Sequence, residues 1–458
     1  MTETKADLVI VGGGSGGYAA ALRGAQLGMS VVLIEQDKVG GTCLHRGCIP
    51  TKALLHVGSI ADSIRASSKY GIDATLLGVN APEMHRYKDR VISRLYRGLQ
   101  GLLKSRNIQI VEGHGRLISP TTVTVGVDRY VGEHVVLATG SSAASIPGVE
   151  IGGNVMTSDE ALQLESVPKD VLVLGGGVVG VEFASYWASL GAKVTVLEAS
   201  GRLLPNDDEF ISKQVSLGLR RRGIKIKTGV VVAETKTAGD RVTAVLKSGE
   251  AFEAEYILVA VGRKPNIAEI GLTESGVELT RDFVSTDSHL RTNLPSVFAV
   301  GDLVEGPQLA HRGFQHGIFV AELLAGLEPT PVDELALPRV LYSTPEAVSV
   351  GMTTAHARSR YGDEGINEVV YDLAGNGKSQ VEGSAGAIAV TSGPDSRIVG
   401  VHMVGSKVSE LAGEAQLLYG LEIHVADAAR FLHAHPTRGE GLGEALLALA
   451  GKPLHVHS

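Results

Sequence analysis

Short apolar runs, each followed by glycines and an Ala-rich or amphipathic stretch, recur along the first two thirds of the chain. Residues 7–11 form the first run, an Ala-rich stretch continues to about residue 27, and a second apolar run covers residues 30–34. Apolar runs of this length, bounded by glycine, are typical of buried strands, and the stretch between them is typical of a helix. The pattern therefore predicts a βαβ unit at the start of the chain.

The same pattern returns at residues 170–200, in DVLVLGGGVVGVEFASYWASLGAKVTVLEAS. Further apolar runs that end in Gly or Asp at residues 134–142, 256–266 and 296–302 predict strands followed by turns. Residues 157–162 predict a helix that opens with a capping box of Thr157 and Glu160. The boundary between the two βαβ units is therefore expected near residues 143–156.

The pattern changes from about residue 337. Strands are predicted in LYSTPEAVSVG, GAIAVTS and IVGVHMVG, and helices at residues 408–420, 425–432 and 440–450. The predicted fold class is therefore α/β, with two βαβ-based domains and a C-terminal α+β domain. We expect domains at residues 1–144 and 145–268, a segment at 269–336 that completes the first domain, and a last domain at 337–458.

Each βαβ unit carries a G-x-G-x-x-G fingerprint in its turn and an acid at the end of its second strand. The first glycine permits the tight turn, the second lets the backbone approach a pyrophosphate, and the third lets helix and strand pack closely. One match could be a Gly-rich turn, but both copies have 23 positions from first glycine to acid (12 to 35 and 175 to 198). The two sets are Gly12, Gly14, Gly17 and Glu35, and Gly175, Gly177, Gly180 and Glu198. They predict two Rossmann-like dinucleotide sites.

The acid of the second unit also bears on which dinucleotide binds. Glu198 would accept hydrogen bonds from an adenosine ribose and repel a 2′-phosphate, and the next arginine is Arg202. The second site is therefore expected to prefer NAD over NADP.

Composition narrows the class of protein further. The chain has 458 residues and a mass of 47.8 kDa, a length typical of roughly two to four domains. Its net charge of −8 argues against a general nucleic-acid binder, which needs a basic face to neutralise phosphates. No apolar run reaches the ~18 residues of a membrane span, and the first residues lack the apolar core of a signal peptide. We therefore expect a soluble, cytoplasmic protein.

Only two cysteines occur, Cys43 and Cys48, in VGGTCLHRGCIPTKALL directly after the first unit. On an ideal helix, residues five apart lie too far from each other for a disulfide, so a bond needs a distorted first turn. Gly47 and Gly40–Gly41 allow such a distortion, and a strained bond would be readily reduced. The alternatives are two inert buried thiols or an open metal set of Cys43, His45 and Cys48, which fits no closed zinc motif.

The segment HAHPTRGE at residues 433–440 gathers two histidines, a proline and an acid. An imidazole beside a thiol lowers the thiol pKa by becoming its cation, and a carboxylate can orient such a base. His433 or His435 could supply the base, with Glu440 as the orienting acid, and a solvated loop is the alternative.

Together these motifs resemble the pyridine nucleotide–disulfide oxidoreductases, and within them the dihydrolipoyl dehydrogenase group. The similarity covers nearly the whole chain: both fingerprints, GGTCLHRGCIPTKALL, LATG, GVEFA, VAVGRKPN, VFAVGD, QLAH, and HAHPT followed by Glu440. The Leu-His-Arg filling between the cysteines and the HAHPT segment are more similar to the lipoyl enzymes than to glutathione or mercuric reductases. The resemblance implies an FAD domain, an NAD domain and a dimerisation domain that forms a homodimer.

The resemblance also assigns cofactor contacts. The residues implied for FAD are Gly12, Gly14, Gly17, Glu35, Lys52, Gly115, Asp302 and Ala310. Lys52 would lie by the flavin and pair with Glu182, and Asp302 would hold the ribityl chain. The residues implied for NAD are Gly175, Gly177, Gly180, Glu182, Glu198, Val230 and Gly262.

For catalysis the resemblance implies Cys43, Cys48, His435 and Glu440, and no metal. Cys48 would face the flavin and Cys43 would exchange with substrate through a redox-active Cys43–Cys48 disulfide. His435 aligns with the family base because it directly precedes Pro436, and the peptide between these two residues is expected to be cis. The implied reaction is FAD-dependent oxidation of protein-bound dihydrolipoyl groups to lipoyl disulfide with reduction of NAD.

The implied partners are lipoylated domains of 2-oxo acid dehydrogenase complexes or of the glycine cleavage system. Rival interpretations are a related reductase that acts on a small disulfide or a quinone, and a redox-sensing flavoprotein. Glu198 weighs against a reductase driven by NADPH, and a sensor would need no base on a remote domain. Two positions depart from the family: Thr51 replaces the commoner Ser, and His316 stands where Glu is usual.

Overall fold

The computed structural model describes residues 2–455. The chain divides into two compact units. The first contains residues 1–53, 82–144 and 262–334, and the second contains residues 54–81, 145–261 and 335–458. Within the described residues, no helix is both long and apolar enough to cross a bilayer.

The first unit is built on a seven-stranded sheet in the order β3-β2-β1-β6-β5-β4, with β19 also paired to β6. Its strands are β1 (Glu3–Val11), β2 (Val31–Glu35), β3 (Gln109–Glu112), β4 (Arg116–Ser119), β5 (Thr122–Val125), β6 (Asp128–Leu137) and β19 (Val297–Ala299). β1 runs parallel to β2 and β6, and β6 runs parallel to β19. The late strand β19 therefore completes a sheet that the first residues of the chain begin.

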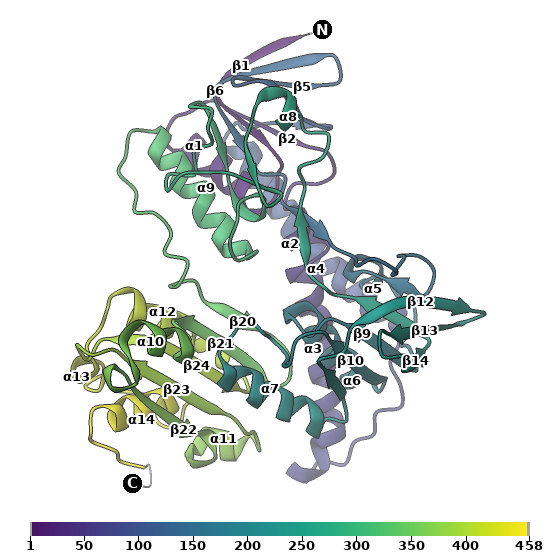
Figure 1. Ribbon diagram of the computed structural model, residues 1–458, viewed down its shortest axis with the longest axis vertical. Helices are drawn as coiled ribbons and strands as arrows, with labels where there is room; N and C mark the ends of the chain where they lie inside the picture. The colour runs from purple at the N-terminus through teal and green to yellow at the C-terminus, as the bar shows by residue number, and fades with distance from the viewer. Residues whose placement is uncertain (1, 456–458) are drawn as a thin grey trace. The chain divides into compact units, whose positions relative to one another are not determined.

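Both faces of this sheet are covered, which explains why its central strands are continuously apolar. Leu8 and Ile10 of β1 face a core that includes α1 (Ser15–Gln26) and α9 (Ala310–Leu324). Val9 and Val11 face the opposite core. α1 and α9 lie side by side in Figure 1. Smaller elements of this unit are α2 (Gly41–His45), β7 (Ser141–Ala143), β16 (Arg263–Pro265), α8 (Leu272–Ser275), β17 (Leu279–Thr280) and β18 (Phe283–Val284).

Two long helices have residues in both units. The first is α3 (Cys48–Ala66), which passes from the first unit into the second after Ala53. The other is α4 (Ala81–Ser105), whose first residue, Ala81, belongs to the second unit and whose other residues belong to the first.

The second unit contains a parallel sheet in the order β11-β10-β9-β15-β8. Its strands are β8 (Val155–Met156), β9 (Asp170–Leu174), β10 (Lys193–Glu198), β11 (Lys225–Thr228) and β15 (Tyr256–Val259). The predicted capping box of Thr157 and Glu160 is present at α5 (Ser158–Ala161). The crossover helix is α6 (Val178–Leu190), and an antiparallel sheet of β12 (Val232–Ala238), β13 (Arg241–Leu246) and β14 (Ala251–Ala254) is inserted before β15.

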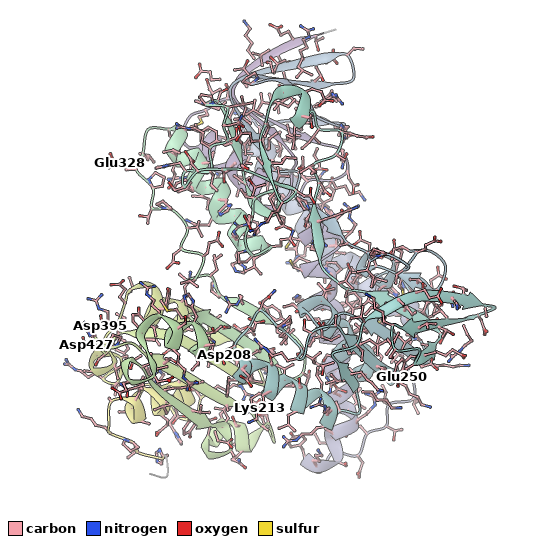
Figure 2. All side chains as sticks on the ribbon, in the orientation of Figure 1. Asp208, Lys213, Glu250, Glu328, Asp395 and Asp427 are labelled. Carbon is pink, nitrogen blue, oxygen red and sulfur yellow. The ribbon has the colours of Figure 1, made fainter. Side chains whose placement is uncertain are left out.

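α7 (Glu209–Arg221) is tied to the C-terminal part of the same unit. Asp208, labelled in Figure 2, caps α7 by accepting the Phe210 amide at 2.8 Å, and its other oxygen accepts the Thr354 amide at 2.7 Å. His402 lies beside it, fully buried, with Nδ1 2.8 Å from Ser349 Oγ. Burial lowers the pKa of His402, although Asp208 acts to raise it.

The C-terminal part has a five-stranded sheet in the order β20-β21-β24-β23-β22, covered by α12 (Ala412–Gly420) and α14 (Gly439–Leu449). The strands are β20 (Arg339–Leu341), β21 (Glu346–Gly351), β22 (Asn367–Asp372), β23 (Ala387–Ser392) and β24 (Ile398–Gly405), and the shorter helices are α10 (Thr354–Tyr361), α11 (Gly377–Val381) and α13 (Val425–Ala428). The predicted fold class, α/β with a C-terminal α+β part, is confirmed. β22 and α10 were not predicted.

Two helix predictions in this part are wrong in extent. The helix expected at residues 408–420 begins as a 3-10 turn, Val408–Leu411, and the helix expected at 425–432 ends at Ala428. Leu432 is 99% exposed, so a further turn of α13 would have no core to pack against.

Candidate functional site

The first glycine loop connects β1 to α1 and contacts the acid at the end of β2. Glu35 accepts the Gly13 amide through Oε2 at 2.6 Å and the Asp37 amide through Oε1 at 2.8 Å. The carboxylate is therefore held at the mouth of the loop by two backbone donors. Only the tertiary fold brings Glu35 back to Gly13, 22 residues earlier.

Two of the three glycines of this loop exclude a side chain through the protein's own geometry, and the third, Gly14, does not. Gly12 has a φ of +104°, and a Cβ on Gly17 would lie 1.8 Å from the Gly12 carbonyl oxygen. A Cβ on Gly14 would meet nothing within 4 Å, although Gly14 caps the N-terminus of α1. The loop thus leaves open space in front of the first helical amides, where a phosphate group fits. This geometry suits the pyrophosphate of FAD.

The second loop repeats this geometry in the second unit. A Cβ on Gly180 would lie 2.0 Å from the Gly175 carbonyl oxygen, while Gly177 has open space around it. Glu198 accepts the Gly176 amide at 2.5 Å and the Ser200 amide at 2.6 Å. The site therefore suits a second dinucleotide, with its acid fixed in the same way as the first.

Arg202, the nearest arginine after Glu198, has its guanidinium engaged inside the protein. It donates to the carbonyl oxygens of Pro205 and Asp207, each at 2.8 Å, and to the Ser212 hydroxyl. Because the Arg202 guanidinium already donates to these groups, it is not free to bind a 2′-phosphate. The structure therefore removes the basic residue that would have favoured NADP.

Of the remaining residues assigned to the second dinucleotide, two lie in the second unit and one lies in the first. Glu182 is buried on α6 and accepts the Tyr342 amide at 3.1 Å, and the Val230 amide donates to the Glu198 carbonyl oxygen at 3.0 Å. Gly262 has a φ of +129° and belongs to the first unit. The predicted pairing of Glu182 with Lys52 joins residues of the two units and stays a prediction.

Asp302 lies in a 3-10 turn, Gly301–Leu303, directly after β19. Its Oδ2 accepts a hydrogen bond from Ser141 Oγ at 2.6 Å, and Arg263 donates in turn to Ser141 Oγ at 2.7 Å. The carboxylate therefore has a fixed orientation. Sequence reasoning missed both supporting residues, because their contacts span 161 and 122 positions.

The other two residues assigned to FAD lie on the same unit. Ala310 is the first residue of α9, so its amide is among those that lack an acceptor within the helix. A Cβ on Gly115 would lie 2.9 Å from Val11 Cγ1, which leaves no room for a side chain there.

The two cysteines lie on either side of a helix break. Cys43 is in α2, which ends at His45, and Cys48 is the first residue of α3. Arg46 has a φ of −138°, outside the helical range, so the distortion that a Cys43–Cys48 bond requires is present. Both cysteines are free thiols here, joined by a side-chain hydrogen bond.

The electrostatics of the pair favour a protonated Cys43. The hydrogen bond with Cys48 and burial raise the pKa of Cys43, while the charge of Lys52 acts to lower it. The same pair affects Tyr18 on α1, because burial and the charge interactions with Cys43 and Cys48 raise the pKa of Tyr18 to about 12. A thiol that keeps its proton needs an external base before it can react as a thiolate.

His45 is oriented by other contacts. Its Nε2 lies 3.0 Å from the Val39 carbonyl oxygen, and its ring contacts Tyr96 edge-on. Since a carbonyl oxygen only accepts, Nε2 is the protonated nitrogen and is not available to a metal. Within residues 2–455 no group of three His, Cys, Asp or Glu side chains could hold a metal ion.

In the second unit the structure brings His435 and Glu440 together. His435 Nδ1 lies 2.7 Å from Glu440 Oε1, while Glu440 Oε2 accepts the Thr437 amide at 2.7 Å. Burial acts to raise the pKa of Glu440, but these two hydrogen bonds, together with the charges of His435 and His455, outweigh it and the pKa is lowered. The His435 side chain is 78% exposed, so its other nitrogen is open to a reacting group, and the His435–Pro436 peptide is cis as expected.

His433, the other candidate base, is engaged elsewhere. Its Nε2 lies 2.8 Å from Glu414 Oε1 in α12, and its side chain is only 13% exposed. The hydrogen bond that His433 donates to the Glu414 carboxylate raises the pKa of His433. The structure thus separates two histidines that the sequence left equivalent, because Glu414 lies 19 residues before His433.

Comparison with known proteins agrees with this geometry. Residues 6–317 match the profile of the family described as pyridine nucleotide-disulphide oxidoreductase, and residues 337–446 match the dimerisation domain of that family. Dihydrolipoyl dehydrogenase of Bacillus subtilis is 38% identical over 99% of both chains. Dihydrolipoyl dehydrogenases of Pseudomonas aeruginosa and Geobacillus stearothermophilus are 36% and 34% identical over 99% of this chain and 99% and 97% of theirs.

Solved structures show the same fold. A crystal structure of LpdA from Mycobacterium tuberculosis superposes with a TM-score of 0.90 at 22% identity, over 98% of this chain and 100% of that one. The flavoprotein disulfide reductase RclA from Escherichia coli superposes with a TM-score of 0.87 at 25% identity, over 97% and 99%. The two glycine loops, the cysteine pair and these matches lead to one conclusion: the chain is an oxidoreductase that belongs to the pyridine nucleotide-disulphide oxidoreductase family.

Proposed function

We propose that the chain is an FAD-dependent dihydrolipoyl dehydrogenase, which oxidises protein-bound dihydrolipoyl groups to lipoyl disulfide and reduces NAD. The observation that carries the proposal is the cysteine pair. Cys43 and Cys48 flank a helix break and share a hydrogen bond, shortly after the first βαβ unit and in the same compact unit. Full-length similarity to dihydrolipoyl dehydrogenases supports the choice of substrate.

The sulfur chemistry proceeds in two exchanges. A thiolate of the dihydrolipoyl group attacks Sγ of Cys43 in the Cys43–Cys48 disulfide, which forms a mixed disulfide at Cys43 and releases Cys48 as thiolate. The second substrate thiolate then attacks the substrate sulfur of that mixed disulfide. Cys43 leaves and takes up the proton of the second substrate thiol, the lipoyl disulfide closes, and the protein keeps the two electrons with Cys43 as a thiol and Cys48 as a thiolate.

The base for this exchange is His435. With Nδ1 held against Glu440 at 2.7 Å, Nε2 is the nitrogen that takes the proton of the attacking thiol. Glu440 fixes the tautomer and stabilises the imidazolium that forms, while its second oxygen stays on the Thr437 amide. In the reduced pair, the raised pKa of Cys43 favours the thiol form, so Cys43 holds a proton after it leaves the mixed disulfide.

The cofactors are assigned by unit. Gly12, Gly14, Gly17, Glu35, Gly115, Asp302, Ala310 and Lys52 would hold FAD in the first unit. When bound, FAD supplies the two-electron relay between the dithiol and NAD. Glu198 and the second glycine loop would bind the NAD ribose and pyrophosphate, with Glu182, Val230 and Gly262 completing the site.

We infer the domain roles from the same residues. Residues 1–144 and 269–336 would bind FAD, which the pairing of β19 with β6 supports, and residues 145–268 would bind NAD. Residues 337–458 would form a homodimer interface, through which His435 of one subunit reaches the cysteine pair of the other. The partners would be lipoylated domains of 2-oxo acid dehydrogenase complexes or of the glycine cleavage system, and the cytoplasmic location stays a prediction.

The direct test is NADH formation from dihydrolipoamide and NAD by the purified yellow holoenzyme. Wild type should turn over, and Cys43→Ser and Cys48→Ser should each lose nearly all activity while they retain flavin. No NADH from dihydrolipoamide, together with rapid reduction of a small disulfide by NADH or NADPH, would favour the rival reductase.

Subunit mixing tests the shared site. Cys43→Ser and His435→Ala homodimers are each expected to be nearly inactive. In a mixed dimer, one of the two composite sites regains an intact cysteine pair and an intact base, so activity should rise towards half the wild-type value. Exchange confirmed with tagged subunits, but without recovered activity, would exclude a base supplied by the partner.

A further inference from the structure

His316, which stands where the family usually has Glu, is buried directly behind the turn that carries Asp302. The Gly301 amide donates to His316 Nδ1 at 3.3 Å, and His316 is only 2% exposed. Gly301 has a φ of +69°, a conformation that favours glycine, and this turn carries Asp302 as its next residue. His316 therefore holds the residue next to Asp302.

Arg312 lies four residues before His316 on α9 and binds backbone carbonyl oxygens in and after the 3-10 turn of Gly301–Leu303. Its guanidinium donates to the carbonyl oxygens of Gly301 at 3.2 Å and Glu305 at 2.6 Å. Glu334 accepts from Arg312 Nε at 2.7 Å, and Glu334 Oε1 also lies 4.0 Å from His316 Nε2. Glu334 is thus the carboxylate that lies against both Arg312 and His316.

The protonation state of His316 fits its role as an acceptor. An imidazole that accepts a hydrogen bond through Nδ1 must lack a proton there. Burial, followed by the neighbouring Arg312 charge, lowers the pKa of His316 to about 3. The ring is therefore neutral at any pH at which the enzyme works, and the Gly301 amide always has its acceptor.

We propose that His316 is a positioning residue for the flavin site: its neutral ring fixes the Gly301 amide and thereby the orientation of Asp302 toward FAD. The inference rests on the proposed binding of FAD by this unit and assigns a role to a residue that departs from the family pattern. Ser141 restrains the Asp302 carboxylate itself, at 2.6 Å, while His316 and Arg312 restrain the backbone that carries it.

The test is the dissociation constant of FAD, measured by ultrafiltration of the diluted holoenzyme at a series of protein concentrations. His316→Leu removes the acceptor and leaves a buried amide without a partner, which should weaken FAD binding about tenfold. His316→Asn branches at the same carbon and keeps an acceptor near the Nδ1 position, so it should stay within about twofold of wild type. His316→Met gives a second deletion that adapts better to the core if the Leu variant does not fold.

Two further comparisons separate positioning from general structural damage. His134→Leu is the matched control, because His134 is in the same unit and its buried Nδ1 has no hydrogen-bond partner among the described residues. It should bind FAD as wild type does. In an Asp302→Asn background, His316→Leu should weaken FAD binding by less than twofold, since its effect passes through Asp302.

Either of two results would overturn the inference. One is wild-type FAD affinity in the folded deletion variants. The other is the same tenfold loss whether or not Asp302 is intact. A wild-type protein that binds no FAD would instead refute the proposed function, and the inference with it.

Discussion

Gly177→Ala is the substitution that most directly separates cofactor binding from folding. Gly177 caps the N-terminus of α6 with φ −76° and ψ −176°, an extended conformation that alanine adopts without strain. A Cβ at this position would meet no protein atom within 4 Å. The new methyl group would therefore occupy only the space through which a pyrophosphate approaches the helix.

The expected magnitude follows from the hydrogen bonds that the methyl group blocks. A hydrogen bond to a charged group contributes roughly 1.5–3 kcal/mol, and the first amides of a helix supply such donors to a phosphate. Loss of one of them removes about 1.5–3 kcal/mol of NAD binding, which corresponds to a rise in KM for NAD of about 10-fold to 150-fold. The stability of the unit should change by less than about 1 kcal/mol, because no atom is displaced.

The assay compares KM for NAD, flavin content and the thermal unfolding midpoint in three variants. Gly180→Ala should lose stability as well as NAD binding, since its Cβ would lie 2.0 Å from the Gly175 carbonyl oxygen. Gly201→Ala, where a Cβ also meets nothing within 4 Å, is the control that should leave both quantities unchanged. If Gly177→Ala binds NAD as tightly as wild type does, the open space at Gly177 is not the pyrophosphate site and the reasoning fails.

Three further outcomes are expected. Glu198→Arg should shift the ratio of kcat/KM for NAD and NADP towards NADP, whereas a wild-type enzyme that uses both equally would contradict the role given to the Glu198 carboxylate. Cys48→Ser should abolish the long-wavelength thiolate-to-flavin absorption of the reduced enzyme and Cys43→Ser should keep it; the reverse would exchange their roles. Because burial lowers the pKa of His402 below its unfolded value of about 6.5, the unfolded state binds a proton first as the pH falls. The unfolding midpoint should therefore drop between pH 7.5 and 5.5, and drop less in His402→Gln; equal slopes would rule out this contribution.

The two dinucleotide loops and their acids could be predicted because their signals are local. Run length, glycine spacing and chain order define a strand, a turn and a helix within about 30 residues. The distorted turn at the cysteines followed from the same kind of local argument, and the helix break at Arg46 agrees with it. The extent of α13 could not be predicted, since it depends on whether residues after Ala428 find a core to pack against.

The sequence by itself determined the α/β class, the two glycine-rich βαβ motifs and the chemical types of the side chains at each site. The tertiary structure alone decided which partner each side chain has. In the folded chain, Arg202 donates to internal carbonyl groups, and the Gly301 amide donates to His316. His433 pairs with Glu414, whereas His435 pairs with Glu440. The physical reason is that a hydrogen bond depends on distance and direction in space. Packing of residues far apart in the chain sets both, whereas propensity and periodicity act only over neighbouring residues.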